Sequence, residues 1–289
     1  MSRLNPTVTS ACLLSIALSL ASAVGIAQDT NEQRVDLGGF KLNTQQSGSG
    51  GPVVVFVAGL GEDLSTWHSV QPKVAQFSRT FAYDRAGLGK SDPSPATKSV
   101  EHMVSELHTL LASAKIAPPY ILVGHSLGGA IVQLYAFTYP DEIAGLVLVD
   151  PEDGRLLDRL QARMPADQWD ARQKMLDQMM SQASPAQKAE LQESRASSKA
   201  LANALPLPKV PTVLLTGTLK DPSFPGNPLE QDLKLELQNE LLVKLPYARH
   251  VLVPNSRHYI QEDAPDLVID AVREVVNDAG SSHSSESKS

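Results

Sequence analysis

Short, continuous runs of apolar residues recur along the chain and alternate with segments that have a helical pattern. The runs lack the alternation of a half-exposed strand, so they predict strands that are covered on both faces. They lie at residues 53–57, 81–83, 120–123, 144–149, 213–215 and 250–253. The helical patterns lie between them, at residues 100–114, 128–139, 229–245 and 265–276. This order predicts an α/β fold with a doubly wound, mostly parallel sheet.

Two segments lie outside this alternation. Residues 33–43 predict a small leading hairpin. Residues 154–207 are rich in Gln, Ala, Met and charged residues and poor in β-branched ones, which predicts a helical insertion between two strands. Trp169 falls there together with four of the six methionines, Met164, Met175, Met179 and Met180. Two interpretations stay open: these side chains seat the insertion on the body below, or they form an adaptable apolar lid over a pocket.

The N-terminal segment has the layout of a signal peptide. Arg3 supplies a positive charge, and a mostly apolar run without charge follows over residues 11–27. Small residues permit cleavage after Ala23 or after Ala27. We therefore predict a signal peptide over residues 1–27 and export to the periplasm or the exterior, with no stable membrane span after cleavage. An uncleaved anchor is the alternative, because a run of about 17 residues is near the lower limit for spanning a bilayer.

The composition narrows the class of protein that follows this segment. Apolar residues make up 42% of the chain and charged residues 20%, which is typical of a globular protein, and we expect one large domain over residues 28–279. The single cysteine, Cys12, lies in the predicted signal peptide, so we expect neither disulfides nor a cysteine nucleophile in the mature protein. The formal net charge of -7 argues against binding to nucleic acid. Residues 280–289 are rich in serine and predict a disordered tail.

The strongest chemical signal is a Gly-x-Ser-x-Gly motif centred on Ser126, which joins the apolar run 120–123 directly to a helical pattern. This context is typical of a serine held at the apex of a tight strand-to-helix turn, with Gly124 and Gly128 as its small neighbours. The amide of Leu127 then lies at a helix N-terminus, where a free N–H can stabilise the oxyanion of a tetrahedral intermediate. The motif predicts a serine nucleophile.

A second oxyanion donor is expected from the loop that follows the first buried strand. That strand ends in Ala58-Gly59-Leu60-Gly61, and we predict the amide of Leu60 as the donor. The alternative is a flexible loop whose glycines only relieve crowding.

The general base is predicted to be His258, which follows the last strand and precedes the last helix. Loops at the carboxyl ends of the strands of a doubly wound sheet share one face, so His258 can meet Ser126 despite their separation in sequence. The other histidines lie inside the serine motif, in the tail or in helix and strand patterns: His125, His283, His68, His102, His108 and His250. Because no histidine or cysteine spacing is typical of a metal site, we predict no metal.

The carboxylate that would orient this histidine has two candidates. Asp221 follows the strand at 213–215 and precedes His258, in the chain order serine, acid, histidine. Asp150 follows the preceding strand and could reach the same imidazole. We favour Asp221 and keep Asp150 as the alternative, because either could instead serve as a turn or helix-capping aspartate.

Taken in this order, these motifs resemble the α/β-hydrolase superfamily, in its serine-nucleophile, esterase- and lipase-like branch, over residues 53–276. Residues 83–92, Tyr-Asp-Arg-Ala-Gly-Leu-Gly-Lys-Ser-Asp, resemble that family's loop before the first large helix. The resemblance implies an eight-stranded, mostly parallel sheet, a helical cap inserted after the sixth strand, no cofactor, and hydrolysis through an acyl-enzyme. Relatives similar to haloalkane dehalogenases and epoxide hydrolases carry aspartate where this chain has Ser126, which argues against those reactions.

Residues and resemblance together predict a hydrolase that cleaves a small or medium carboxylic ester. The same catalytic triad could instead act on amides or lactones or in perhydrolysis, and a binding protein without turnover is a further alternative. Two features depart from the family pattern: Ala58-Gly59 replaces a frequent His-Gly, and the spacing from Gly217 to Asp221 is one residue longer than usual. The second departure is the reason that Asp150 stays open as the acid. Nothing in the sequence indicates an oligomeric state.

Overall fold

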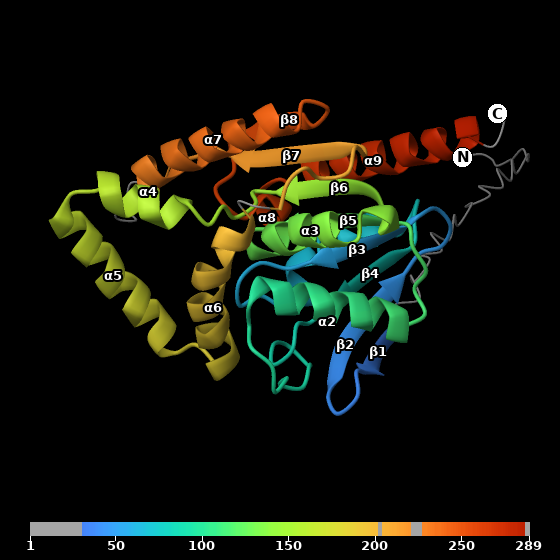
Figure 1. The fold of residues 1–289 in the computed structure, drawn as a ribbon, viewed down its shortest axis with the longest axis horizontal. Coiled ribbons are helices and arrows are strands. Elements are labelled where there is room, and N and C mark those ends of the chain that lie inside the picture. The colour runs from blue at the N-terminus through green and yellow to red at the C-terminus, as the bar shows by residue number, and fades with distance from the viewer. Residues whose placement is uncertain (1–30, 202–203, 221–226, 287–289) are drawn as a thin grey trace, which may run out of the picture.

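The computed structural model describes residues 31–201, 204–220 and 227–286, and an eight-stranded sheet forms its centre (Figure 1). The strands are β1 (Asn31–Asp36), β2 (Lys41–Ser47), β3 (Val53–Val57), β4 (Thr80–Tyr83), β5 (Tyr120–His125), β6 (Ile143–Val149), β7 (Thr212–Gly217) and β8 (Arg249–Val253). Their order across the sheet is β1-β2-β4-β3-β5-β6-β7-β8. β2 pairs antiparallel with β1 and β4, and all pairs from β4 to β8 are parallel. The predicted fold class is confirmed.

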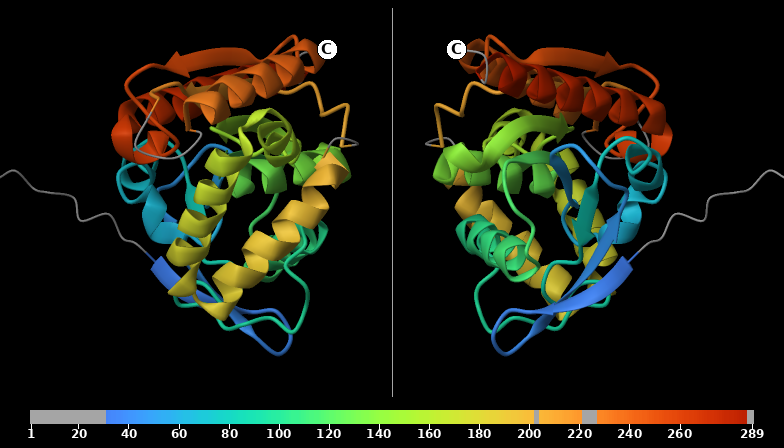
Figure 2. Two further views of the ribbon diagram at one scale, coloured as in Figure 1. Left: turned by 90° about the vertical axis from the view of Figure 1, so that its left-hand side faces the viewer. Right: turned by 90° about the vertical axis from the view of Figure 1, so that its right-hand side faces the viewer.

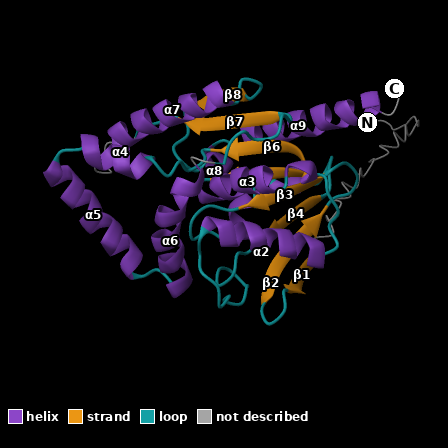
Figure 3. Cartoon of the chain, viewed as in Figure 1, coloured by secondary structure: helices purple, strands orange, loops and turns teal. Residues whose placement is uncertain are grey.

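Helices cover both faces of the sheet, which is why its inner strands are apolar throughout (Figure 3). Successive residues of β3 enter opposite cores: Val55 packs in the core on the side of α2 (Val100–Ser113) and α3 (Leu127–Thr138), and Phe56 in the core on the side of α9 (Pro265–Glu286). The short elements η1 (Leu64–Trp67), α1 (Gln71–Val74), η2 (Pro140–Glu142) and α8 (Ile260–Asp263) fill the remaining connections.

The predicted insertion is helical and lies between β6 and β7. It consists of α4 (Leu156–Arg163), α5 (Ala166–Ser181) and α6 (Pro185–Leu201), and Figures 1 and 2 show α5 and α6 converging at the turn that joins them. The cap lies at the end of the sheet toward which the parallel strands point, and α7 (Asn227–Lys244) follows β7 beside α4.

The methionines of the cap divide between the two interpretations that the sequence left open. Met164 is buried and packs with Leu160 of α4 and Leu233 of α7, so it seats the cap on the body. Met175 and Met179 are exposed on α5. Burial therefore supports the seating role for Met164 but not for the exposed Met175 and Met179.

The C-terminal segment differs from the predicted tail. α9 continues past Gly280 and ends at Glu286. Extending an existing helix adds one backbone hydrogen bond for each residue that is fixed, and Ser281 Oγ donates to the carbonyl of Asn277 at 2.9 Å. The predicted signal peptide lies outside the described residues. Within those residues, no helix is both long enough and apolar enough to cross a membrane.

Candidate active site

Ser126 lies at the apex of the turn between β5 and α3, as the motif predicts. Its backbone has φ 51° and ψ -118°, a strained conformation that persists only when the surroundings impose it. The neighbouring glycines are required by packing: a Cβ at Gly124 would overlap the carbonyl oxygen of Gly128, and a Cβ at Gly128 would overlap that of Val57. The turn places Ser126 at the carboxyl end of β5.

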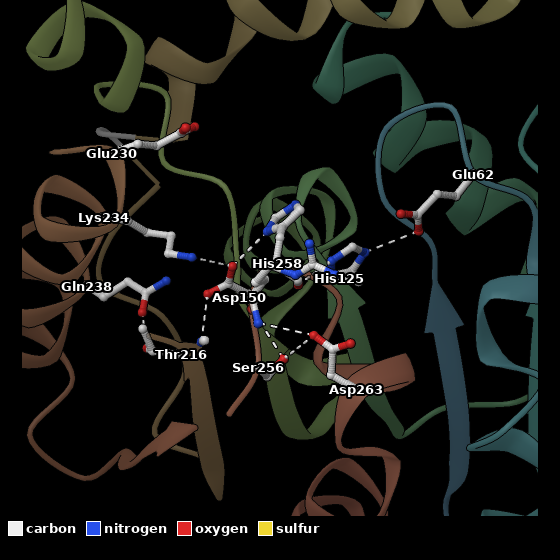
Figure 4. Close-up of polar contacts among 12 residues, drawn as sticks. Glu62, His125, Asp150, Thr216, Glu230, Lys234, Gln238, Ser256, His258 and Asp263 are labelled. Carbon is white, nitrogen blue, oxygen red and sulfur yellow. Dashed lines mark hydrogen bonds and ion pairs between the residues drawn. The ribbon is translucent and has the colours of Figure 1, made fainter. Parts of the chain in front are cut away.

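Asp150 is the carboxylate that contacts His258. Their atoms Oδ2 and Nδ1 are 2.7 Å apart, and Asp150 is fully buried immediately after β6 (Figure 4). Asp150 Oδ1 accepts a hydrogen bond from the amide of Gly217 at 3.1 Å. The backbone φ of Asp150 is 45°, in the left-handed region that Asp tolerates better than most residues. Asp221, the carboxylate favoured from the sequence, lies outside the described residues.

The backbone fixes the serine turn relative to this carboxylate. The amide of Ser126 donates to the carbonyl of Val149 at 3.1 Å, and the amide of Glu152 donates to the carbonyl of Ser126 at 3.0 Å. These two bonds place the loop that carries Asp150 directly beside the serine turn.

His258 is held in place through its main chain and through the loop that precedes it. His125 Nε2 donates to the carbonyl of His258 at 3.0 Å, and the two imidazole centroids are 4.7 Å apart. Asp263 Oδ2 accepts hydrogen bonds of 3.1 Å from Ser256 Oγ and from the amide of Arg257. His125, the residue before Ser126, thus anchors the loop that carries His258. The side chain of His258 is 39% exposed.

Lys234 of α7 is a charged neighbour of this pair that sequence reasoning missed. Its Nζ lies 2.6 Å from Asp150 Oδ2, the same oxygen that contacts His258. Burial alone would raise the pKa of Asp150, but the charge of Lys234 and the hydrogen bond from His258 outweigh it and hold that pKa below its usual value. The pKa of His258 is lowered, chiefly by burial; the hydrogen bond to Asp150 opposes this shift, while the charges of His125 and Lys234 add to it.

The loop after β3, where Leu60 was predicted to donate to an oxyanion, is held on both sides of that residue. Glu62 Oε2 accepts from the amide of Gly59 at 2.8 Å. On the other side, the amide of Gly61 donates to Glu190 Oε2 at 2.8 Å, and Gln187 Nε2 donates to the carbonyl of Gly61 at 2.9 Å. Both of the latter side chains belong to α6 of the cap.

Arg85 also connects the loop after β3 to helix α6 of the cap. Its guanidinium donates to the carbonyls of Ala58 and Gly59 at 2.6 and 2.5 Å. It also forms a bidentate ion pair with Glu190, at 2.7 and 2.9 Å, and both side chains are almost fully buried. Burial opposes the charge of Arg85, but the adjacent Glu190 carboxylate raises the pKa of Arg85 above its usual value. Arg85, from the segment 83–92, therefore supports the loop in which Leu60 is the predicted oxyanion donor.

Two backbone amides of the described chain, one after β3 and one after β5, remain without an acceptor. Among the described residues, neither the Leu60 nor the Leu127 amide nitrogen has a hydrogen-bond acceptor. Leu127 opens α3, where backbone N–H groups have no partner within the helix. The arrangement supplies a hydroxyl in a strained turn, an imidazole bonded to a buried carboxylate, and unused amide donors on neighbouring loops. Among residues 31–201, 204–220 and 227–286, no cluster of metal-ligating side chains is found.

The chain matches the α/β hydrolase family over residues 54–271. It belongs to that family. Among curated proteins, it is similar to the uncharacterized protein YqjL of Bacillus subtilis, with 39% identity over 124 residues. That match covers 43% of this chain and 49% of YqjL, so the chain spans about half the length of this relative.

Solved structures of similar fold cover most of this α/β hydrolase. A lipase-like protein from Acinetobacter baumannii, described as a putative lipase, superposes with a TM-score of 0.67 and 21% identity over 88% of this chain and 93% of its own. A thermophilic esterase from Thermogutta terrifontis superposes with a TM-score of 0.62 and 19% identity over 86% of this chain and 99% of its own. At these identities the likeness concerns the fold.

Proposed function

We propose that this hydrolase cleaves small or medium carboxylic esters through an acyl-enzyme on Ser126. The observation that carries the proposal is the contact between His258 and Asp150, beside a serine held in a strained turn. In this proposal Asp150 is the acid of the triad and Asp221 is not. The buried carboxylate accepts from Nδ1, which leaves the other imidazole nitrogen, Nε2, free to take a proton from the serine.

The proposed reaction has two steps of the same kind. Ser126 Oγ attacks the acyl carbon while His258 accepts its proton, and the amides of Leu60 and Leu127 bind the oxyanion that forms. The alcohol departs with the proton from His258 and leaves an ester on Ser126. Water then attacks that ester, again with His258 as base, and releases the carboxylic acid with Ser126 restored.

Two considerations support an ester as substrate. An alcohol is a far better leaving group than an amine, so an ester makes the smaller demand on His258 as the acid that protonates the leaving group. The lipase-like protein and the esterase whose folds this chain resembles are named for ester substrates. The cap over the carboxyl ends of the strands would form the walls of the substrate pocket.

The test is turnover of short p-nitrophenyl esters and labelling by a fluorophosphonate, with Ser126→Ala against the control Ser105→Ala, an exposed serine of α2. Ser126→Ala should lower kcat by at least about 10⁴-fold and abolish labelling, whereas Ser105→Ala should behave as the unaltered protein. Turnover that survives in Ser126→Ala, or a protein that neither reacts with the probe nor cleaves any ester, would contradict the proposal.

We further propose that residues 1–27 are a signal peptide and that the mature enzyme works outside the cytoplasm. The motivation is the charged start, the apolar run and the small residues at Ala23 and Ala27. N-terminal sequencing of the exported protein tests this. A mature protein that still begins at Met1 would contradict it and would favour the membrane anchor.

A further inference from the structure

One oxygen of the proposed catalytic carboxylate is shared by two donors. Asp150 Oδ2 lies 2.7 Å from His258 Nδ1 and 2.6 Å from Lys234 Nζ, as Figure 4 shows. Its other oxygen is occupied by the amide of Gly217. Asp150 is fully buried and the side chain of Lys234 is only 9% exposed, so solvent screens this contact weakly.

Hydrogen bonding alone does not require a lysine here. Asp150 already has an acceptor bond on each oxygen, from Gly217 and from His258, so the carboxylate would be satisfied without a third donor. Lys234 contributes a full positive charge instead. Burying an ammonium is costly unless it is paired, and Lys234 is paired with the same carboxylate oxygen that contacts His258.

The net charge of Asp150, Lys234 and His258 shows how the lysine affects protonation of the imidazole. With a neutral imidazole, the Asp150 carboxylate and the Lys234 ammonium cancel. When His258 takes up a proton, the three groups carry a net charge of +1 in a partly dehydrated site, and the carboxylate that should stabilise the imidazolium is already engaged by the lysine. Two cations competing for one oxygen disfavour the second of them.

Among the described residues, the other ionisable groups that face His258 come from two further segments and from its own loop. His125, at the end of β5, packs against its imidazole, and Glu62, after β3, pairs with His125 Nδ1 at 3.1 Å. Tyr259, the next residue, has its ring centroid 5.4 Å away. Unlike these three groups, Lys234 forms an ion pair with Asp150, the carboxylate partner of His258.

We propose that Lys234 is a positioning residue that keeps His258 unprotonated, and so active as a base, at mildly acidic pH. It acts through Asp150, whose charge it shares with the imidazole, and it touches neither substrate nor serine. An enzyme with this lysine retains activity in a more acidic medium than one without it. This inference rests on the proposed function, because it assigns a working pH to the same base.

The experiment is the pH profile of kcat/KM for a p-nitrophenyl ester between about pH 4 and 9, where the acid limb reports the ionisation of the base in the free enzyme. Lys234→Met removes the charge and keeps most of the apolar stem, Lys234→Gln keeps a neutral donor, and Lys234→Arg keeps the charge. The matched control is Lys220→Met, which removes the same charge from an exposed lysine that pairs with Asp232.

Lys234→Met and Lys234→Gln should move the acid limb upward by about one pH unit, so that kcat/KM on that limb falls about tenfold while the plateau changes little. Lys234→Arg and Lys220→Met should keep the limb of the unaltered enzyme. If Lys234→Met does not fold, Lys234→Gln carries the same prediction.

Acid limbs that coincide in all variants would overturn the proposal, as would an equal shift in Lys220→Met. A plateau lowered without displacement of the limb would also overturn it, because that result describes a lysine that only maintains the fold. Failure of the proposed function is distinguishable, since the unaltered enzyme would then show neither turnover nor fluorophosphonate labelling.

Discussion

Replacement of Glu190 by glutamine should lower both the thermal stability of this α/β hydrolase and the rate of its proposed ester hydrolysis. Glu190 is fully buried on α6 of the cap, where one carboxylate receives the guanidinium of Arg85 and the amide of Gly61. Glutamine keeps the shape and one acceptor oxygen, but it turns an N–H₂ group toward the donors of Arg85 and leaves that buried cation without its counter-charge.

The magnitude follows from these contacts. Breaking a buried ion pair by removing one partner costs about 3–5 kcal/mol, and for a domain of this size each kcal/mol lowers Tm by about 2–4 °C. We therefore expect Tm to fall by about 6–20 °C. The loop that carries Leu60, the proposed oxyanion donor, is weakened by the same substitution, because the Gly61 amide and Arg85 share one oxygen of Glu190 and must compete for the single acceptor that glutamine keeps. Loss of a single oxyanion donor lowers kcat by about 10²–10³-fold, which is the upper bound for a displaced Leu60 amide.

The assay separates these two effects. Thermal unfolding followed by circular dichroism gives Tm, and ester hydrolysis measured well below the Tm of the variant gives kcat and KM. Because negative charge on the acyl oxygen develops only on the way to the transition state, kcat should fall with little change in KM. Glu101→Gln, which neutralises an exposed carboxylate in the first turn of α2, is the control; it should leave kcat unchanged and lower Tm by at most about 4 °C, less than the fall expected for Glu190→Gln.

A variant with a lowered Tm and an unchanged kcat would refute the reasoning, because the ion pair would then stabilise the cap without shaping the oxyanion loop. An unchanged Tm would refute it at an earlier step, because Arg85 would not depend on Glu190 for its charge balance.

Two further predictions concern the base and its carboxylate. Asp150→Asn should lower kcat by about 10⁴-fold, since a neutral amide no longer fixes the imidazole tautomer, whereas Asp221→Asn should stay within about threefold of the unaltered enzyme; kinetics on one ester decide, and the reverse result would make Asp221 the acid. Because the pKa of His258 is lowered, chiefly by burial, the acid limb of kcat/KM should have its midpoint below about 6.5, with activity present above that midpoint and lost below it. A midpoint above about 6.5, or a flat profile, would contradict the assignment of His258.

Most of the fold could be predicted because each element has its own local signal. The apolar runs of β3 to β7 are buried on both faces, and the helical patterns between them alternate with those runs along the chain. The end of α9 could not be predicted in this way. Its last turns are polar and contain glycine and several serines, so their helical state follows from the helix that precedes them and not from their own composition.

The candidate site divides along the same line. Ser126 and His258 carry recognisable signals, because a strained turn demands glycines at fixed spacing and a histidine between the last strand and the last helix stands out. The acid was ambiguous for a geometric reason: Asp150 and Asp221 follow β6 and β7 in the sequence, and these adjacent parallel strands end at the same edge of the sheet. The contact with His258 is what favours Asp150 here.

The residues that the sequence did not predict lie on helices far along the chain from the residues that they contact. Lys234 is 84 positions from Asp150, and Glu190 is 105 from Arg85; neither lies in a motif, and each reads as an ordinary charge of a solvated helix face. Their burial depends on how α6 and α7 pack over the carboxyl ends of the strands. Such a packing has no local signature in the sequence.

The positions of Glu190 and Lys234 suggest a role for the cap in the proposed catalysis besides that of forming the pocket walls. α6 fixes the amide and the carbonyl of Gly61, next to the predicted oxyanion donor, and α7, which packs beside α4 of the cap, delivers Lys234 to the proposed acid. The predicted oxyanion donor and the proposed triad acid would thus both be supported by segments that follow β6 in the chain. Substitutions in the cap helix α6 should therefore alter kcat as well as the choice of substrate, because the segment that would wall the pocket also holds the loop on which the transition-state charge is to be stabilised.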